Sequence, residues 1–405
     1  MSNLYSQIAQ RAKELEKNTT EFLMDMVRIP SYSCKEKDVV LRIKQEMEKA
    51  GFDEVRIDGL GNVIGRIGNG PKTIAFDAHI DTVETGDLSA WQGGGPFEPR
   101  VEDGNIYGRG TVDQEGGMAS MVYAGKIIKD LKLNDQFTVL FTGTVMEEDC
   151  DGLCWQYLIK EEKIRPELVV ITEPTNMNIY RGHRGRMEIR VTFFGRSCHG
   201  SAPERGDNAI YKASRCALEI EKLNEKLRFD PFLGKGTVTV TQATSSSPSL
   251  CAVADGATLH LDRRLTLGET KASAIAEVRA AAYRAGLMES DFNVEVLQYA
   301  EKAYTGLVYP TEKYYPTWAM PEDSPFLKQA VEAYQGALGK APLVDKWTFS
   351  TNGIATAGMH NIPTLGLGPG NEVYAHAPNE HCPVEHLSGA AAFYAALVAH
   401  MNGKA

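Results

Sequence analysis

The chain has 405 residues and lacks the features that mark exported and membrane-bound proteins. Residues 1–18 contain no apolar segment of the kind found in signal peptides, so we expect a cytoplasmic protein. The longest apolar run, Ala390 to Val398, is shorter than the roughly 20 residues that a membrane-spanning helix needs. We therefore expect no membrane partner.

Positive charge and paired cysteines are also scarce. The chain has 43 Lys and Arg against 53 Asp and Glu, a net charge of −10 that repels phosphate backbones, so we expect no nucleic-acid partner. Its 7 cysteines are odd in number and irregularly spaced, which indicates reduced thiols, most of them buried and inert. These absences leave a small molecule as the expected partner.

What the chain does have is an average globular composition, with 43% hydrophobic and 24% charged residues. At about 150 residues per domain, this length predicts two or three domains. Helical spacing over residues 5–47 is followed by strands that alternate with helices as far as Ile171. This alternation predicts an α/β catalytic domain with a mixed, largely parallel sheet flanked by helices.

Past Pro174 the pattern changes to long alternating strands, with helices near residues 208–227 and 269–285, and this indicates a smaller α+β unit. Helices return after about Tyr299. We therefore expect a catalytic domain formed by residues 1–180 and 298–405, interrupted by an inserted α+β domain at residues 181–297.

The first candidate site motif is Asp77-Ala-His79-Ile-Asp81-Thr-Val83, at the end of a predicted strand that begins at Thr73. Side chains two residues apart on a strand point the same way, so His79 and Asp81 share a face. Open α/β sheets bind ligands at this carboxyl end, and a carboxylate can fix the tautomer of a metal-binding histidine. A buried histidine paired with an acid for stability alone is the other interpretation.

The second motif, residues 108–117, is dense in glycine and precedes a predicted helix. Backbone amides at a helix start can bind phosphate, but the sequence has neither a following Lys-Ser/Thr pair nor the GxGxxG pattern. We instead expect the glycines to let Asp113 turn inward at the helix N-terminus, where a carboxylate is favoured.

The third motif has four carboxylates in five residues, from Glu147 to Asp151, just after an apolar strand. Such acids repel one another unless cations neutralise them, although hydrated surface acids would also explain the pattern. Glu173 ends another apolar strand, and His376 follows a late glycine-rich turn. In an α/β sheet all of these positions can share one rim.

Counting the possible ligands on that rim favours metal chemistry. Two imidazoles and three carboxylates, with no thiolate, suit a pair of zinc-like ions that share one carboxylate. Glu147 is then left over beside the ligands. A carboxylate in that position can take a proton from an attacking water and return it to the leaving nitrogen.

Six stretches together resemble the M20 metallopeptidases and amidohydrolases. They are HIDTV at 79–83, GRGTVDQEGG at 108–117, EED at 147–149, TEP at 172–174, CHGSAPERGDNAI at 198–210 and GPG to AHAPNE at 368–380. That family includes succinyl-diaminopimelate desuccinylase, acetylornithine deacetylase, aminoacylase and a glutamate-releasing carboxypeptidase. The chain is most similar to the branch of selenium-metabolism-linked hydrolases.

The resemblance implies two divalent ions, most readily zinc, with cobalt or manganese as alternatives. It assigns one ion to His79, Asp113 and Glu173, and the other to Asp113, Glu148 and His376. It further implies Glu147 as the general base, Asp81 as the acid that orients a ligand, and a cis peptide bond after Asp113.

The inserted domain resembles the family's lid, which implies a homodimer paired through the lid. In this resemblance His199 reaches the partner's active site, and Arg264 grips a substrate carboxylate while Arg263 points the other way into solvent. Asn208 and Asn352 are the further candidates for substrate contacts. Two departures, Cys251-Ala-Val-Ala254 for Asn-x-x-Pro and Thr351-Asn352 for Thr-Asp, leave the substrate open.

We therefore expect a hydrolase that cleaves an amide bond in a small carboxylate-bearing substrate. The alternative is a hydrolytically silent binding or regulatory protein of the same fold, which would be expected to have lost Glu147 or a ligand. A thiol hydrolase using Cys198 beside His199 is disfavoured, because adjacent residues rarely have the geometry of nucleophile and base.

Overall fold

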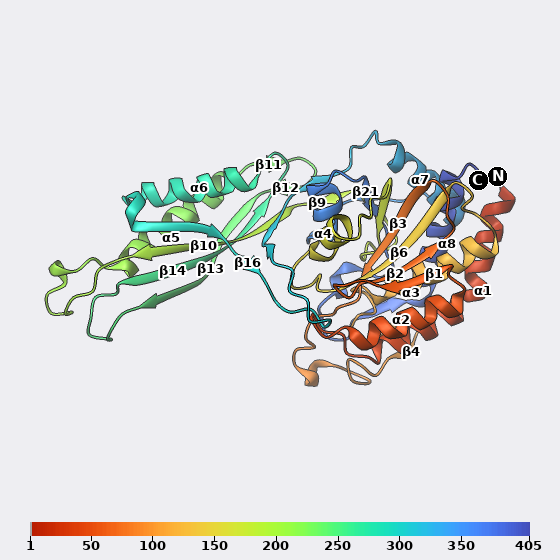
Figure 1. Cartoon of the computed structure of the whole chain (residues 1–405), viewed down its shortest axis with the longest axis horizontal. Coiled ribbons are helices and arrows are strands. Elements are labelled where there is room, and N and C mark those ends of the chain that lie inside the picture. The colour runs from red at the N-terminus through yellow and green to blue at the C-terminus, as the bar shows by residue number, and fades with distance from the viewer. Residues whose placement is uncertain (1) are drawn as a thin grey trace.

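The computed structural model describes residues 2–405 and has two parts, which we call the main body and the lobe (Figure 1). The main body is built around an eight-stranded sheet, and the lobe projects from it around a five-stranded sheet. Each part has a hydrophobic core of its own. The site described below lies where the lobe faces the main body.

The main sheet is mixed and largely parallel at its centre, as the sequence predicts. Strands β6, β3, β7 and β21 run parallel, whereas β1 and β2 pair antiparallel at one side. The strand order is β1 (Glu54–Ile57), β2 (Val63–Ile67), β6 (Phe137–Thr144), β3 (Lys72–His79), β7 (Leu168–Ile171), β21 (Thr364–Gly366), β8 (Ile179–Tyr180) and β20 (Val344–Asp345). The central strands are buried, so they read as continuous apolar runs.

Helices cover the faces of this sheet. They are α1 (Ser2–Val27), α2 (Lys37–Ala50), α3 (Glu115–Asp130), α4 (Leu153–Lys160), α7 (Pro325–Leu338) and α8 (Val384–Met401). Helix α8 is buried along Ala390–Ala399 because it packs against α1, α3 and α7. Within residues 2–405 no helix combines the length and the apolar character that crossing a membrane requires.

A small three-stranded sheet at the edge of the main body positions part of the site. It consists of β4 (Arg100–Glu102), β5 (Asn105–Tyr107) and β22 (His381–Pro383). Because β5 pairs with β22, the loop that follows β5 lies beside the residue before β22, and the Gly108 N–H donates to the Glu380 carbonyl at 3.0 Å. This pairing joins two motifs that are far apart in the sequence, since Arg109 and Glu380 are separated by 271 positions.

The lobe is an antiparallel sheet with two helices on one face, an α+β arrangement. Its strands are β13 (Thr237–Ser246), β14 (Gly256–Leu265), β10 (Gly185–Phe194), β15 (Phe292–Val296) and β18 (Tyr314–Tyr315), and its helices are α5 (Ala209–Lys226) and α6 (Lys271–Arg284). Burial alternates strictly along β14, so one face of the sheet packs under the helices.

The prediction that Arg263 is solvated is wrong. Arg263 lies on the buried face of β14 together with Leu261 and Leu265, and its side chain is fully buried. Its Nη2 lies 2.7 Å from Glu269 Oε1 and 2.9 Å from Glu277 Oε2, and both acids belong to the segment that packs over this face. The face assignment was correct, but the face is covered.

The remaining elements are short. They are β9 (Gly182–His183) paired with β19 (Trp318–Ala319), β11 (Phe229–Asp230) with β12 (Gly234–Lys235), β16 (Gln298–Tyr299) with β17 (Thr311–Glu312), and the helical turns η1 (Leu88–Ala90), η2 (Pro203–Arg205), η3 (Glu289–Asp291), η4 (Ile354–Met359) and η5 (Glu372–Tyr374). Tyr299 packs into the main core, whereas Tyr314 packs against the lobe core. The domain limits at 180/181 and 297/298 therefore stay predictions.

Candidate metal centre

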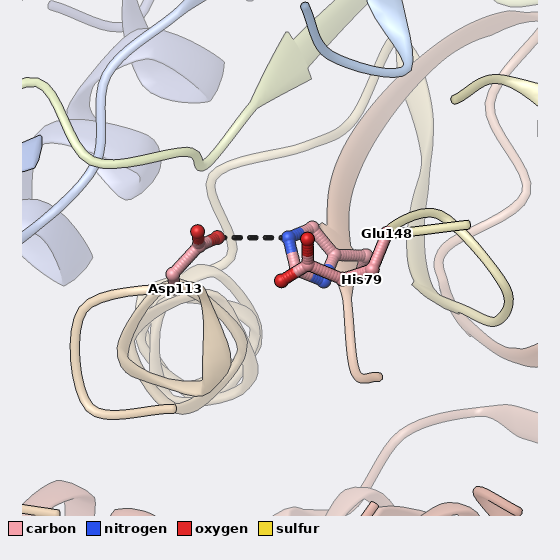
Figure 2. Close-up of side chains that lie close together, drawn as sticks. All are labelled: His79, Asp113 and Glu148. Atoms are coloured by element: carbon pink, nitrogen blue, oxygen red, sulfur yellow. Dashed lines mark hydrogen bonds and ion pairs between the residues drawn. The ribbon is translucent and has the colours of Figure 1, made fainter. Parts of the chain in front are cut away.

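The five residues predicted as metal ligands lie together at the carboxyl end of the main sheet. His79 ends β3, Asp113 precedes α3, and the other three lie in loops after β6, β7 and η5. Figure 2 shows three of them, His79, Asp113 and Glu148, with their side chains directed toward one another. The remaining two are Glu173 and His376. Sequence positions almost 300 residues apart thus meet at one point.

Asp113 lies between the two imidazoles. Its Oδ1 is 2.9 Å from His79 Nε2, the contact dashed in Figure 2, and its Oδ2 is 3.1 Å from His376 Nε2. Each carboxylate oxygen therefore faces a different histidine nitrogen. A carboxylate in this position can be shared between two cations.

The two halves of the cluster differ in solvent exposure. In the inner half, Glu173 Oε1 lies 3.5 Å from His79 Nε2, and these side chains are 2% and 1% exposed. In the outer half, Glu148 Oε1 lies 3.1 Å from His376 Nε2, and the His376 side chain is 51% exposed. Solvent and substrate therefore reach the cluster from the His376 side.

The cluster contains buried carboxylate oxygens without a hydrogen-bond partner. Within residues 2–405, Glu147 Oε1 and Glu173 Oε2 are buried and unpaired. Burial raises the pKa of Glu147 and of Glu173 well above the usual range, and neighbouring acids such as Asp113 raise that of Glu173 further. Unpaired buried acids are costly, and imidazole with carboxylate is a donor set that divalent ions accept. The residues present therefore fit a metal centre.

Asp81 acts on the cluster in a different way from the one expected. His79 Nδ1 lies 2.9 Å from the main-chain carbonyl of Asp81 but 3.7 Å from its Oδ1. The carbonyl therefore holds the Nδ1–H tautomer and leaves Nε2 free to bind a metal. The buried Asp81 carboxylate instead accepts the N–H groups of Glu147 at 3.1 Å and Glu148 at 3.0 Å, and so positions that loop.

A buried ion pair that sequence reasoning missed supports Asp113. Glu380 Oε2 lies 2.6 Å from Arg109 Nη1, and its Oε1 accepts the N–H groups of Val112 at 2.8 Å and Asp113 at 3.1 Å. Both side chains lie within the motifs already singled out, but nothing in their spacing pairs them. The peptide bond between Asp113 and Gln114 is cis, as the resemblance implied.

The cluster lines a cavity of about 340 Å³ between the main body and the lobe. Arg264, predicted as a substrate contact, reaches this cavity from strand β14 of the lobe. Among the other residues of the wall, Asp151 belongs to the acidic motif already described, whereas sequence reasoning did not single out Arg186, Phe349, Ser350 or Glu372. Three of the four acids of that motif line the cavity, namely Glu147, Glu148 and Asp151, whereas the fourth, Asp149, is exposed.

Three other predicted residues do not line this cavity in the described chain. His199 is exposed in the lobe segment between β10 and α5, and Asn208 caps α5 by accepting the Ile210 N–H at 2.9 Å. Asn352 is buried, with its Nδ2 donating to Asp77 Oδ2 at 2.8 Å and its Oδ1 accepting the Gly152 N–H at 2.9 Å. The amide of Asn352 is thus engaged inside the protein.

The cysteines follow their prediction in part. Cys150, Cys154, Cys216 and Cys382 are buried, Cys34 and Cys198 are half-buried, and Cys251 is exposed. Cys198 Sγ contacts the carbonyl of Ala202 at 3.3 Å, and the described residues show no contact between this thiol and the His199 ring. This arrangement gives no support to a thiol hydrolase.

Comparison with known proteins places this site in a family. The model for peptidase family M20/M25/M40 matches residues 75–400, which include every residue of the cluster. The chain belongs to that family. It is 57% identical to the uncharacterized protein YgeY of Escherichia coli (strain K12) over 392 residues, 96% of each chain. As a member of family M20, the chain is a metal-dependent hydrolase of the metallopeptidase and amidohydrolase class.

Solved structures show the same fold. The aminopeptidase PepT from Bacillus cereus superposes with a TM-score of 0.73 at 22% identity, covering 95% of this chain and 98% of that one. The Bacillus subtilis protein YXEP, described as a dinuclear metal-binding peptidase of the M20 family, has a TM-score of 0.71 at 16% identity, covering 97% and 99%. At such identities the likeness concerns the fold.

Proposed function

We propose that the protein hydrolyses a peptide or N-acyl amide bond in a small carboxylate-bearing substrate, with two divalent ions held by the cluster. The observation that carries this proposal is the position of Asp113, whose two oxygens face His79 and His376 separately. Glu173 would complete one ion's ligands and Glu148 the other's. The dinuclear site of YXEP supports the pair, and the nitrogen and oxygen donors suit zinc, with cobalt or manganese as alternatives.

We assign the general base to Glu147. It follows Met146 in a loop whose amides Asp81 fixes, and its buried Oε1 has no partner in residues 2–405. When bound, the two ions would supply Lewis acidity to the scissile carbonyl and lower the pKa of water. Glu147 would accept a proton from the attacking water and return it to the leaving nitrogen.

The lobe is proposed to be a lid and a dimerisation domain over residues 181–297. His199 is exposed and away from the cavity of its own chain, so it would serve the partner's cavity in a homodimer. The lobe also carries the exposed apolar side chains of Ile210, Tyr211 and Leu218 on α5, which such a dimer would cover. A cytoplasmic location stays a prediction.

Metal content and one substitution test the activity. The purified chain should bind about two divalent ions and hydrolyse members of a panel of N-acyl amino acids and dipeptides, and a chelator should abolish turnover. Glu147→Gln should lower kcat by about 10²- to 10⁴-fold with the metal content unchanged. The matched control Glu301→Gln, at an exposed position, should leave kcat unchanged.

Two outcomes would contradict the proposal. Turnover that survives both chelation and Glu147→Gln would exclude the metal mechanism. Metal binding without turnover of any compound would favour the hydrolytically silent alternative.

For the dimer, mixing His199→Ala chains with Glu147→Gln chains should restore part of the activity, because one cavity in the mixed dimer has both residues intact. The absence of any recovery would contradict a role for His199 across subunits.

A further inference from the structure

Two arginines lie directly opposite each other on the wall of the cavity that the lobe provides. Strands β10 and β14 pair antiparallel with Arg186 across from Arg264, and both side chains line the cavity that holds the cluster. Like charges directly opposite in a sheet destabilise it unless something compensates them. This pair therefore needs negative charge nearby.

Acidic side chains neutralise the charges of the two arginines unequally. The next cross-strand pair on the same face is Glu188 opposite Asp262. Asp262 receives two hydrogen bonds from Arg264, from Nε at 2.8 Å and from Nη2 at 3.0 Å. Arg186 makes one contact with Glu188, at 3.3 Å, and Glu188 also accepts Lys313 Nζ at 3.1 Å on both of its oxygens. Of the two arginines, Arg186 thus has the weaker contact with an acid.

Arg186 is nevertheless held in place. Its side chain is only 19% exposed, and its guanidinium carbon lies 4.8 Å from the centre of the Tyr315 ring. Its Nε is buried and without an acceptor among residues 2–405. A guanidinium held in this way at the wall of a cavity is suited to bind an anionic group that enters the cavity.

We infer that Arg186 is a further, specificity-determining residue of the subsite in which Arg264, as the family resemblance implies, holds the carboxylate of the substrate. This inference rests on the proposed function and names the group that holds one end of its substrate. Paired guanidinium groups suit a carboxylate because each presents planar N–H donors to its oxygens. The metal cluster lies across the same cavity, so the scissile bond would lie between the two.

Asp151 offers a competing explanation for Arg186. It also lines the cavity, where it accepts a hydrogen bond from Ser350, and its charge raises the pKa of Arg186. Arg186 could then serve only to offset this acid. Within residues 2–405, however, no ion pair of 4.0 Å or less joins Arg186 to Asp151, and both side chains line the cavity that a substrate would enter. The two explanations differ in what the loss of Arg186 does to ligand choice.

Binding measurements on zinc-loaded protein separate them. In a Glu147→Gln background, which prevents turnover, dissociation constants are measured by calorimetry for N-acetyl amino acids and dipeptides, each as the free carboxylate and as the carboxamide. At least one compound should bind roughly 10- to 100-fold more tightly as the carboxylate, and Arg186→Met should remove most of this preference. Arg186→Lys should retain part of it, because it keeps the charge without the planar fork.

Arg190→Met is the matched control. Arg190 is on the same strand but is exposed outside the cavity, with Glu295 Oε1 at 3.5 Å, so its loss should leave the preference unchanged. Thermal melting checks that each variant is folded. If Arg186→Met does not fold, the comparison is made with Arg186→Lys instead.

An undiminished carboxylate preference in folded Arg186→Met, or in Arg186→Lys where only that variant folds, would overturn the inference and leave Arg186 as the counter-charge of Asp151. The lack of a preference in any compound would overturn it as well. Hydrolysis of the same panel is measured separately with Glu147 intact. Failure of hydrolysis counts against the proposed function, whereas the binding comparison judges the subsite.

Discussion

Buried acids in two regions of the main body have opposite surroundings. Glu380 is buried against Arg109, and Glu46 on α2 is buried against Arg42, Lys49 and the Tyr123 hydroxyl. At the end of the main sheet, in contrast, the buried Glu147 and Glu173 each have a carboxylate oxygen without a partner in residues 2–405. In the first region the chain supplies cations to its buried acids, whereas in the second the two acids keep an unpaired oxygen, as a site for an external cation would.

Removing the arginine from the first region should have the largest effect on stability. Arg109→Met leaves the Glu380 carboxylate buried with no opposite charge, and we expect a loss of about 3–5 kcal/mol in the free energy of unfolding. Because Glu380 also accepts the Asp113 N–H, metal content should fall too. Urea denaturation and metal analysis measure the two effects.

The control for Arg109→Met is an exposed pair. Lys271 Nζ lies 2.7 Å from Glu312 Oε2 on the surface, and Lys271→Met should cost only about 0.2–1 kcal/mol. If the two substitutions cost the same, the Arg109–Glu380 pair contributes no more than a surface pair, and the comparison drawn above would be wrong.

Metal removal should have the next largest effect, now in the second region. Ions present at 100 times their dissociation constant would stabilise the folded state by about 2.7 kcal/mol per site, so a chelator should lower the melting temperature by several degrees. Asp113→Asn removes the shared ligand, and its melting temperature should respond much less to the chelator. Equal melting of the unsubstituted chain with and without chelator would indicate that the buried acids need no external cation.

The smallest effect concerns pH and Glu46. Burial acts to raise the pKa of Glu46, but hydrogen bonds from Tyr123 and Arg42 outweigh it and leave the pKa below the usual value. An acid with a lowered pKa in the folded state stabilises the protein above its unfolded pKa, and this stabilisation is lost as the pH falls through the folded pKa.

Glu46→Gln should therefore be less stable than the unsubstituted chain at pH 7, by up to about 1.5 kcal/mol, and the difference should shrink as the pH falls below about 4. Thermal melting of both chains across this range, done on chelator-treated protein so that metal binding does not contribute, measures the difference. Glu48→Gln, at a more exposed position on the same helix, should change stability by less than about 0.5 kcal/mol at any pH. A pH-independent Glu46 difference would contradict the assigned pKa shift.

The sequence predicted most of the main body because its patterns are local. The apolar run Leu168–Ile171 and the glycine-dense start of α3 specify a buried strand and an inward-turned Asp113 without reference to distant residues. The candidate ligands were singled out because four of them end or follow a strand or precede a helix, and the carboxyl ends of parallel strands share one edge. His376, the fifth, follows a glycine-rich turn.

What the sequence did not predict depends on contacts across long separations. Arg263 was placed on the correct face of its strand, but only the packing of α6 shows that this face is covered. The pairing of Arg109 with Glu380 depends on β5 meeting β22, and the opposition of Arg186 and Arg264 depends on the register of β10 and β14. Strand register of this kind is set by the whole sheet.

The positions of the metal cluster and the two arginines have an evolutionary consequence. All five cluster residues belong to the main body, whereas Arg186 and Arg264 belong to the lobe sheet. In the proposed site, mutations on the lobe strands would therefore change which molecule is selected and leave the candidate metal ligands intact. A new specificity can arise in such a protein through a few surface-lining changes on a separate layer, without passing through an inactive ancestor.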